Sequence, residues 1–360
     1  MIKKKDLSYF KNKKIIITGH TGFKGSWLSI FLTLLGSKVY GISKDIPSKP
    51  SHFALINLRK KIFESSIINL NKKNKIKKIF KQFKPDIVFH LAAQSLVSRS
   101  YSNPLMTWET NTICTINILE ILKDLKKKTN VIFITSDKVY RNKEITKGYK
   151  EGDELGGLDP YGASKAAAEI AIRSYVKSFF SKKNNKVFIS IARAGNVIGG
   201  GDWSDNRLIP DCIRSWLVNK SVVIRNPAST RPWQHILDVL YGYLSLAINL
   251  DRNKKKFHGE AFNFGPNLKK NYKVIEILKM IKINWPEVKW NVNSNKKFKE
   301  NQLLNLNSKK AFRNLKWFPK LTTYQSVKLT VDWYKEYLIE KSNLYNKTVK
   351  QINFFTNLIR

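Results

Sequence analysis

The sequence has little cysteine, few acidic residues and no long apolar run. Its two cysteines, Cys114 and Cys212, fit neither a metal-binding spacing nor a disulfide framework, which favours a reducing, cytoplasmic setting. The basic N-terminus lacks the apolar core of a signal peptide. The apolar run from Trp27 to Leu35 is too short to cross a bilayer. We therefore expect no metal site and no membrane association.

Acidic residues are far outnumbered by basic ones. Asp and Glu total 26, Lys and Arg total 66, and the net charge is +40. Taken alone, this charge suggests nucleic acid or an anionic membrane as a partner. The lysines, however, are scattered along the whole chain among abundant Asn and Ile, and no nucleic-acid motif accompanies them. We favour compositional bias and expect no nucleic-acid partner, although a basic surface would help to steer an anionic small substrate.

A glycine-rich loop follows the first apolar run. Residues Lys14 to Thr18 predict a buried strand, and apolar residues recur at helical spacing from Trp27 to Leu35. Glycines at such a junction let backbone amides and a helix N-terminus bind a pyrophosphate. The loop therefore predicts dinucleotide binding by Gly19, Thr21, Gly22, Phe23, Lys24 and Gly25.

Two further predicted strands end in residues that are suited to binding the cofactor. Asp45 follows the second predicted strand at about the distance from the loop at which an acidic residue binds the ribose of NAD. Lys44 beside it leaves the choice between NAD and NADP open. The next apolar run ends in small residues against which a cofactor would lie: Leu91, Ala92 and Ala93. We interpret His90, within that run, as a strand residue rather than a catalyst.

Reactive side chains follow the apolar run that ends at Ile134. They are Thr135-Ser136-Asp137-Lys138, and a helical segment further on opens with Tyr161 and Lys165, which are four residues apart and share a face. A cation about 4 Å from a phenol contributes on the order of 4 kcal/mol at an effective dielectric near 20. This lowers the phenol pKa by up to roughly three units. The spacing predicts a tyrosine that serves as a base.

The order of the elements predicts the fold class. Strands alternate with helices, which is typical of an α/β protein with a doubly wound parallel Rossmann sheet, here with a smaller C-terminal α+β substrate-binding domain. We expect an NAD-binding domain in residues 1–192, with segments near 232–264 returning to it. Residues 193–345 are expected to be mainly the substrate-binding domain, and residues 346–360 a helical tail.

Together these motifs resemble the extended short-chain dehydrogenase/reductase superfamily and, within it, the nucleotide-sugar 4,6-dehydratases. The resemblance runs from about Lys14 to about Tyr337. The dehydratases that act on CDP-glucose are the most similar. Four stretches carry this likeness: Gly19 to Leu28, Thr135 to Lys138, Arg193 to Trp203, and Arg231 to His235.

The resemblance implies a self-contained redox cycle on a nucleotide sugar such as CDP-glucose, with NAD as cofactor. Tyr161, helped by Lys165 and the positive nicotinamide, would take the proton of the sugar 4-hydroxyl as hydride leaves C4, while Ser136 binds the 4-oxygen. The resulting ketone acidifies the C5 hydrogen, Asp137 protonates the departing 6-hydroxyl, and hydride returns to C6. Lys138 replaces the glutamate that relatives acting on dTDP-glucose use as the C5 base. It either acts as the base with a lowered pKa or steadies an enolate.

The resemblance also assigns binding residues and an assembly. Asn69, Leu70 and Asn111 would join the cofactor site, together with Tyr161 and Lys165. Gln94, Ser136, Asn196, Arg207 and Arg231 would contact the sugar or its diphosphate. Relatives are commonly homodimers joined through helices near the Tyr–Lys helix, and they serve lipopolysaccharide or other deoxysugar synthesis.

Two other functions compete with this one. The first is a 4-epimerase or a dehydratase for another nucleotide sugar, and the second is a non-catalytic, basic nucleic-acid-binding protein on a dinucleotide fold. The Asp137-Lys138 pair argues against an epimerase, because nothing leaves C6 in epimerisation. The presence of both Tyr161 and Lys165 argues against an inert binder.

Overall fold

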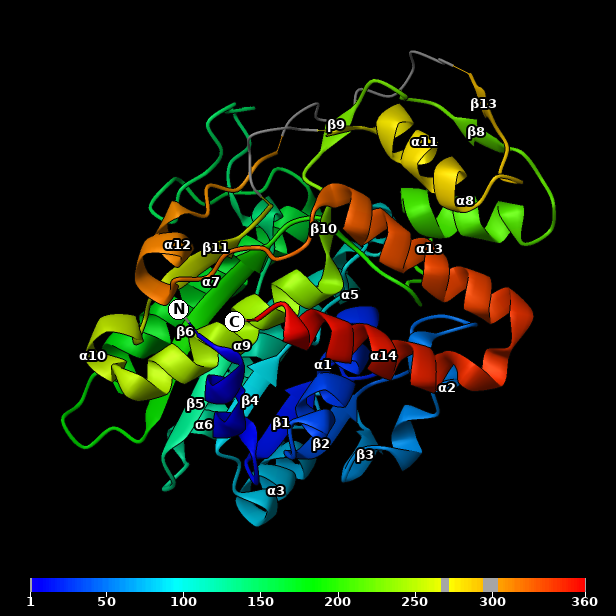
Figure 1. Ribbon diagram of the computed structural model, residues 1–360. Helices are drawn as coiled ribbons and strands as arrows, with labels where there is room; N and C mark the ends of the chain where they lie inside the picture. Colours follow the sequence, from blue (N-terminus) through cyan, green and yellow to red (C-terminus); the bar gives the residue numbers. More distant parts are fainter. Residues whose placement is uncertain (1, 267–271, 294–303, 360) are drawn as a thin grey trace.

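The computed structural model describes residues 2–266, 272–293 and 304–359. Within these ranges the chain builds a seven-stranded sheet of order β11-β6-β5-β4-β1-β2-β3, with helices on both faces (Figure 1). The predicted doubly wound α/β fold is confirmed. The strand order reverses between β1 and β4, which is the place where doubly wound sheets bind ligands.

Every pairing in the central sheet is parallel, so both faces are covered and the strands read as apolar runs. In β1, for example, Ile15, Ile16 and Ile17 are completely buried. The strands are β1 (Lys14–Thr18), β2 (Lys38–Ser43), β3 (Glu64–Ile67), β4 (Ile87–His90), β5 (Thr129–Ile134), β6 (Val187–Ala194) and β11 (Ala261–Phe264).

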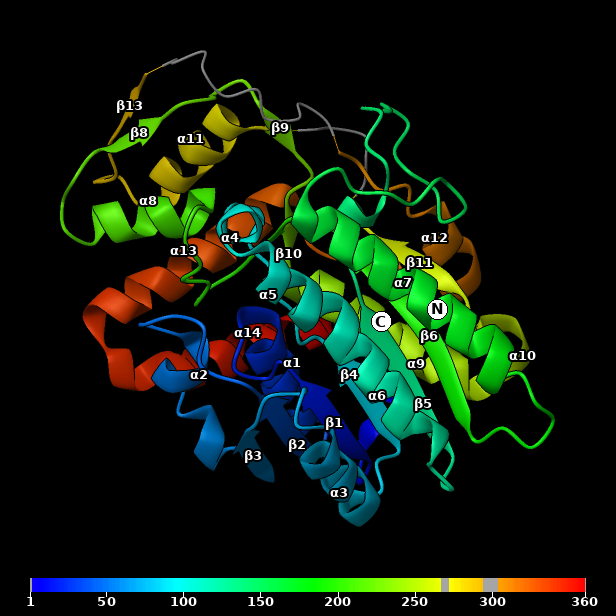
Figure 2. The same cartoon turned by 180° about the vertical axis from the view of Figure 1, so that it is seen from behind.

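The helices divide between the two faces. One face packs against α1 (Phe23–Leu34), α9 (Ile236–Arg252) and α14 (Leu344–Asn357). The other carries α3 (Lys73–Phe83), α6 (Cys114–Lys123) and α7 (Pro160–Phe179), as Figure 2 shows from behind. Shorter helices connect these elements: η1 (Lys4–Phe10), α2 (His52–Leu55), η2 (Leu58–Lys60), α4 (Val97–Ser102), α5 (Pro104–Trp108), η4 (Asp137–Val139) and α10 (Lys254–Phe257).

A smaller group of elements lies beyond one end of the sheet, at the top of Figure 1. Its helices are α8 (Leu208–Trp216), α11 (Val274–Asn284) and α13 (Thr323–Ile339), whereas α12 (Lys309–Leu315) packs beside β11 and η5 (Lys341–Asn343) joins α13 to α14. Three two-stranded pairs accompany them: β7 (Val197–Ile198) with β10 (Gln234–His235), β8 (Val222–Ile224) with β13 (Trp290–Val292), and β9 (Thr230–Arg231) with β12 (Tyr272–Lys273). Parts of the segment predicted to be α+β lie outside the described residues.

One predicted helix has an irregular start. The sequence pattern placed a helix from Asn111 to Leu125, but a π-helical turn, η3 (Glu109–Ile113), precedes α6. Such turns widen the helix locally and often accompany functional sites. Here the turn contains Asn111, a predicted cofactor residue.

Candidate functional site

The glycine loop needs its first and last glycines for packing. Gly19 has a φ of +79°, and a Cβ there would lie 2.7 Å from the backbone nitrogen of Ala92. A side chain at Gly25 would run into the carbonyl oxygen of Gly19. These two positions let the loop lie directly against the end of β4 and the first turn of α1.

The middle glycine leaves room for a ligand. Gly22 is the N-cap of α1 and supplies no side-chain cap to the helix. A Cβ built at Gly22 would meet only the carbonyl oxygen of Gly19, at 3.3 Å. The amides of the first helical turn and the positive end of the helix dipole are therefore suited to an anion. The loop fits the pyrophosphate of a dinucleotide.

Thr21 shapes this loop through its own hydrogen bonds. Its N–H donates to Ser43 Oγ at 3.2 Å and its hydroxyl donates to the carbonyl oxygen of Asp45 at 2.7 Å. His20 is buried between Ser43 Oγ (2.9 Å from Nδ1) and Ser65 Oγ (2.8 Å from Nε2), and burial lowers its pKa to about 4. His20 thus braces the loop against β2 and β3 as a neutral side chain.

The strand ends beside the loop carry the other predicted cofactor residues. Asp45 and Asn69 are exposed after β2 and β3, and Asn69 Oδ1 accepts a hydrogen bond from the amide of Asn71 at 2.9 Å. Leu70 is buried. After β4 lie three half-buried residues: Leu91, Ala92 and Ala93. All of them follow the carboxyl ends of neighbouring parallel strands, which is where the fold places a dinucleotide.

The reactive residues come together where β5 ends and α7 begins. Ser136 Oγ donates to Asp137 Oδ1 at 2.8 Å and accepts from the amide of Lys138 at 3.2 Å. Asp159 caps α7 by accepting a bond from the amide of Gly162 at 2.9 Å. This start places Tyr161 and Lys165 on the buried side of the helix, facing the end of β5.

The predicted lowering of the Tyr161 pKa is not found in this structure. Burial raises the pKa of Tyr161 to about 12, although a side-chain hydrogen bond with Ser136 opposes the shift. Lys165 Nζ donates to the carbonyl oxygen of Ile134 at 3.4 Å, and burial lowers the pKa of Lys165 to about 8, with the nearby charge of Lys24 adding to the effect. Desolvation is the largest effect on the pKa of both groups, and helical spacing alone does not reveal it.

Asp137 has the environment of a proton donor. Burial raises the pKa of its carboxyl, while the charges of Lys138 and Lys24 and the bond from Ser136 limit the rise. Lys24 itself has a pKa lowered to about 8, by burial and by the charge of Arg207. The predicted loop residue Lys24 therefore acts electrostatically on the reactive carboxyl as well as standing at the N-terminus of α1.

Arg207 belongs to the same charged cluster. Its guanidinium pairs with Asp202 Oδ2 at 3.0 Å, and the charges of Asp202 and Tyr161 raise its pKa against the opposing effect of burial. Asp202 closes the glycine-rich stretch that begins at Gly199 and is not among the predicted site residues. Only its ion pair with Arg207 reveals it as part of the site.

Gln94 and Asn111 are engaged within the protein. Gln94 Nε2 donates to Leu96 O (2.9 Å) and Thr107 Oγ1 (3.0 Å), and its Oε1 accepts from the amide of Leu96. Asn111 Nδ2 donates to the carbonyl oxygen of Gln94 (3.1 Å) and to Ser164 Oγ (2.9 Å). These bonds hold the loop after β4 against α7. A contact between Gln94 and a sugar remains a prediction that requires them to rearrange.

The remaining predicted substrate residues lie on separate segments. Asn196 is exposed between β6 and β7. Arg231 is half-buried on β9, and its Nη1 donates to the neighbouring carbonyl oxygen of Thr230 at 2.9 Å. His90 is buried between Thr18 Oγ1 (2.8 Å) and Thr115 Oγ1 (3.2 Å), in keeping with the expected strand role.

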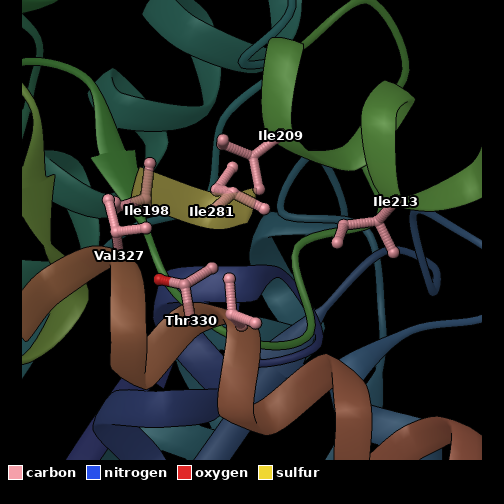
Figure 3. Close-up of a pocket in the computed structure, with 7 residues that line it drawn as sticks. Ile198, Ile209, Ile213, Ile281, Val327 and Thr330 are labelled. Atoms are coloured by element: carbon pink, nitrogen blue, oxygen red, sulfur yellow. The ribbon is translucent and has the colours of Figure 1, made fainter. Parts of the chain in front are cut away.

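A small apolar pocket elsewhere in the molecule carries no reactive group. Figure 3 shows its lining, which comes from β7, α8, α11 and α13: Ile198, Ile209, Ile213, Ile281, Val327, Thr330 and Val331. The Thr330 hydroxyl is used in a bond to the Ser326 carbonyl oxygen at 2.8 Å. We interpret this pocket as imperfect packing between helices.

Two classes of feature are absent from the part of the chain that the structure describes. No group of three or more His, Cys, Asp or Glu side chains is arranged to hold a metal ion. No described helix combines the length and apolar character needed to cross a bilayer.

Known proteins of similar sequence include nucleotide-sugar dehydratases and epimerases. Residues 16–330 match the family described as GDP-mannose 4,6 dehydratase. A CDP-glucose 4,6-dehydratase of Salmonella typhimurium is 40% identical over 338 residues, which cover 92% of this chain and 93% of the relative. A CDP-paratose 2-epimerase of Salmonella typhi is 26% identical and covers 89% of this chain and 98% of the relative.

Solved structures share the fold at lower identity. An epimerase of Methanothermobacter thermautotrophicus superposes with a TM-score of 0.80 at 21% identity, covering 94% of this chain and 97% of its own. A dTDP-glucose 4,6-dehydratase of Bacillus anthracis, solved in complex with NAD, gives a TM-score of 0.71 at 20% identity, covering 89% and 96%.

Proposed function

Because the chain belongs to the GDP-mannose 4,6 dehydratase family, we propose that it converts CDP-glucose to CDP-4-keto-6-deoxyglucose and water. It is a nucleotide-sugar 4,6-dehydratase, a hydro-lyase. The observation that carries the choice of CDP-glucose is the 40% identity, over nearly the full length of both chains, to a relative with that activity. The Asp137-Lys138 pair supports this choice through the resemblance, which implies Asp-Glu at these positions in dehydratases that act on dTDP-glucose.

NAD is the cofactor, and the glycine loop fits its pyrophosphate. Gly19, Gly22, Phe23, Lys24 and Gly25 would hold the diphosphate through backbone amides, with Thr21 fixing the loop. Asp45 would bind the ribose beside the adenine, and the residues after β3 and β4 would line the remainder. When bound, NAD supplies a reversible two-electron acceptor and a positive nicotinamide that favours ionised Tyr161.

The chain's own groups divide the proton transfers. Tyr161 takes the proton of the sugar 4-hydroxyl, whose carbon remains a ketone in the product, while Ser136 donates a hydrogen bond to the 4-oxygen. Asp137, whose pKa is raised by burial, holds the proton that the departing 6-hydroxyl needs. Lys138 stands next to it and acts at C5, either as the base or as a cation that stabilises the enolate.

Residues 1–192 bind NAD and residues 193–345 mainly bind the sugar nucleotide, through Arg207, Asn196 and Arg231. The enzyme is cytoplasmic, consistent with its two buried free thiols. It takes part in lipopolysaccharide or other deoxysugar synthesis and does not depend on nucleic acid or membrane.

We further propose a homodimer formed through α5, α6 and α7, which lie together on one face (Figure 2). Large apolar side chains are exposed there: Leu105, Trp108, Ile113 and Ile170. Light scattering should give twice the mass of the chain, and Ile170→Asp should give the single mass with the fold retained. A monomer in the parent protein would contradict this assembly.

Turnover of CDP-glucose tests the proposed function most directly. Purified protein with CDP-glucose and NAD should form a 4-ketone with absorbance in alkali, and Tyr161→Phe should abolish it. Deuterium placed at C4 should appear in the new methyl group of the product. Turnover of dTDP-glucose, UDP-glucose or GDP-mannose without turnover of CDP-glucose would defeat the assignment of substrate, and deuterium in bulk solvent would defeat the internal cycle.

A further inference from the structure

A buried ion pair lies directly behind the reactive residues. Glu169 is on α7, one turn beyond Lys165 and two turns beyond Tyr161, so the three share a face. Its partner is Arg193 on β6, and neither side chain has any exposed surface. Arg193 Nε donates to Glu169 Oε2 at 3.0 Å and Nη2 donates to Oε1, which makes the pair bidentate.

The same carboxylate reaches the reactive segment after β5. Thr135 Oγ1 donates to Glu169 Oε2 at 3.3 Å, and Thr135 immediately precedes Ser136 and Asp137. On the other side, Arg193 precedes Gly195 by two residues, and a Cβ at Gly195 would lie 2.9 Å from Asp137 Oδ2. Glu169 thus joins α7 to the ends of β5 and β6, the elements that carry the base and the acid.

The arginine is fixed from its far side as well. Its Nη1 donates to the Tyr140 hydroxyl and to the carbonyl oxygen of Glu151, the latter at 3.1 Å. The Tyr140 hydroxyl in turn donates to Asn263 Oδ1 at 2.8 Å, on β11. The network therefore spans β5, β6, β11 and α7 with directional bonds. A buried ion pair is a weak source of stability, since desolvation offsets its attraction, so a role in geometry is the better account.

We propose that Glu169 and Arg193 are positioning residues for the dehydration, which hold the Asp137 carboxyl and the Tyr161 phenol in register on one sugar. They do not touch the substrate themselves. The inference rests on the proposed dehydratase activity. A misplacement of a reacting group by about 1 Å costs on the order of a hundredfold in rate. Loss of the Glu169–Arg193 ion pair should therefore reduce kcat much more than it weakens substrate binding.

A double variant separates positioning from folding. Replacing both partners by apolar residues of similar volume, Glu169→Leu with Arg193→Met, removes the tie without leaving an unpaired buried charge. We expect kcat for CDP-glucose to fall at least about tenfold, with KM changed by no more than about twofold and no loss of thermal stability. The control is Arg173→Met. It removes the half-exposed outer partner of Glu169, 3.0 Å from Oε1, and should keep the parent kcat.

A second variant tests the inference even if the double variant does not fold. Glu169→Asp keeps the charge but withdraws the carboxylate by about 1.5 Å, and it should also lower kcat with little change in KM. A folded double variant with the parent kcat would overturn the inference, as would Glu169→Asp with the parent kcat. If the double variant does not fold, the Glu169→Asp result decides. Parent protein that does not turn over CDP-glucose would instead defeat the proposed substrate.

Discussion

Gly195 offers a sharp test of how the acid is placed, because a single methyl group there meets one functional atom. The Cβ of Gly195→Ala would lie 2.9 Å from Asp137 Oδ2, whereas ordinary contacts begin at about 3.4 Å. The carboxylate must therefore withdraw by about half an ångström. Its other oxygen accepts a 2.8 Å bond from Ser136, so it cannot turn away without stretching that bond.

We expect Gly195→Ala to slow the elimination step. If a displacement of about 1 Å costs on the order of a hundredfold, half of that costs roughly tenfold in the step in which Asp137 protonates the departing oxygen. Folding should be little affected, because the atom that moves is the free end of a side chain. We expect Gly195→Ala to lower kcat about tenfold and to leave the thermal unfolding temperature within about 2 °C of the parent value.

The assay follows both halves of the reaction. Rapid quenching with CDP-glucose deuterated at C4 measures 4-ketone formation separately from appearance of the 6-deoxy product. The matched control is Gly152→Ala, whose added methyl group meets nothing within 4 Å. The reasoning is refuted if Gly195→Ala forms the 6-deoxy product at the parent rate, or if oxidation at C4 slows as much as elimination does.

Three further predictions follow from the same structure. Asp137→Asn should chiefly harm elimination and let the 4-keto hexose accumulate, as judged by product analysis; equal loss of both steps would contradict the proposed division of roles. Burial lowers the pKa of four histidines to about 3 or 4: His20, His52, His90 and His235. In the unfolded chain these histidines bind a proton near pH 6.5, so the unfolding free energy should fall as the pH drops below that value. Between pH 6.5 and 5 each contributes about 2 kcal/mol, and urea unfolding curves that show no such loss would rule this out. Thr348→Val removes the hydrogen-bond partner of both His52 Nε2 (3.2 Å) and Trp333 Nε1 (3.0 Å). The variant should lose about 1–3 kcal/mol of unfolding free energy. An unchanged urea midpoint would show that the docking of α14 does not depend on these bonds.

The sequence predicted the elements whose signal is local. The isoleucine run before the glycine loop reads as a buried parallel strand, and β1 occupies Lys14–Thr18 as expected. The Tyr161–Lys165 spacing placed both side chains on one face of a helix that begins at Pro160. Such patterns can be read from the chain because strand and helix periods, and the need for glycine at a strand–helix junction, depend on near neighbours alone.

The π turn at Glu109–Ile113 had no such signal. Its residues continue the helical pattern on both sides, so only the bonds that Asn111 makes to Gln94 and Ser164 distinguish it. The pKa of Tyr161 was predicted in the wrong direction for a related reason. Proximity to Lys165 follows from helical spacing, whereas the desolvation that raises the pKa depends on everything packed around the phenol.

By itself, the sequence determined the type of fold, the phosphate-binding loop and the chemical types of the reactive groups, since each follows from short patterns along the chain. Only the tertiary structure decided which groups meet. Thr135, Glu169 and Arg193 come from three different elements, and Asp202 reaches Arg207 within the same cluster as Lys24 and Asp137. Parallel packing brings strand ends that are distant in sequence to one edge, and burial there sets which protons are held.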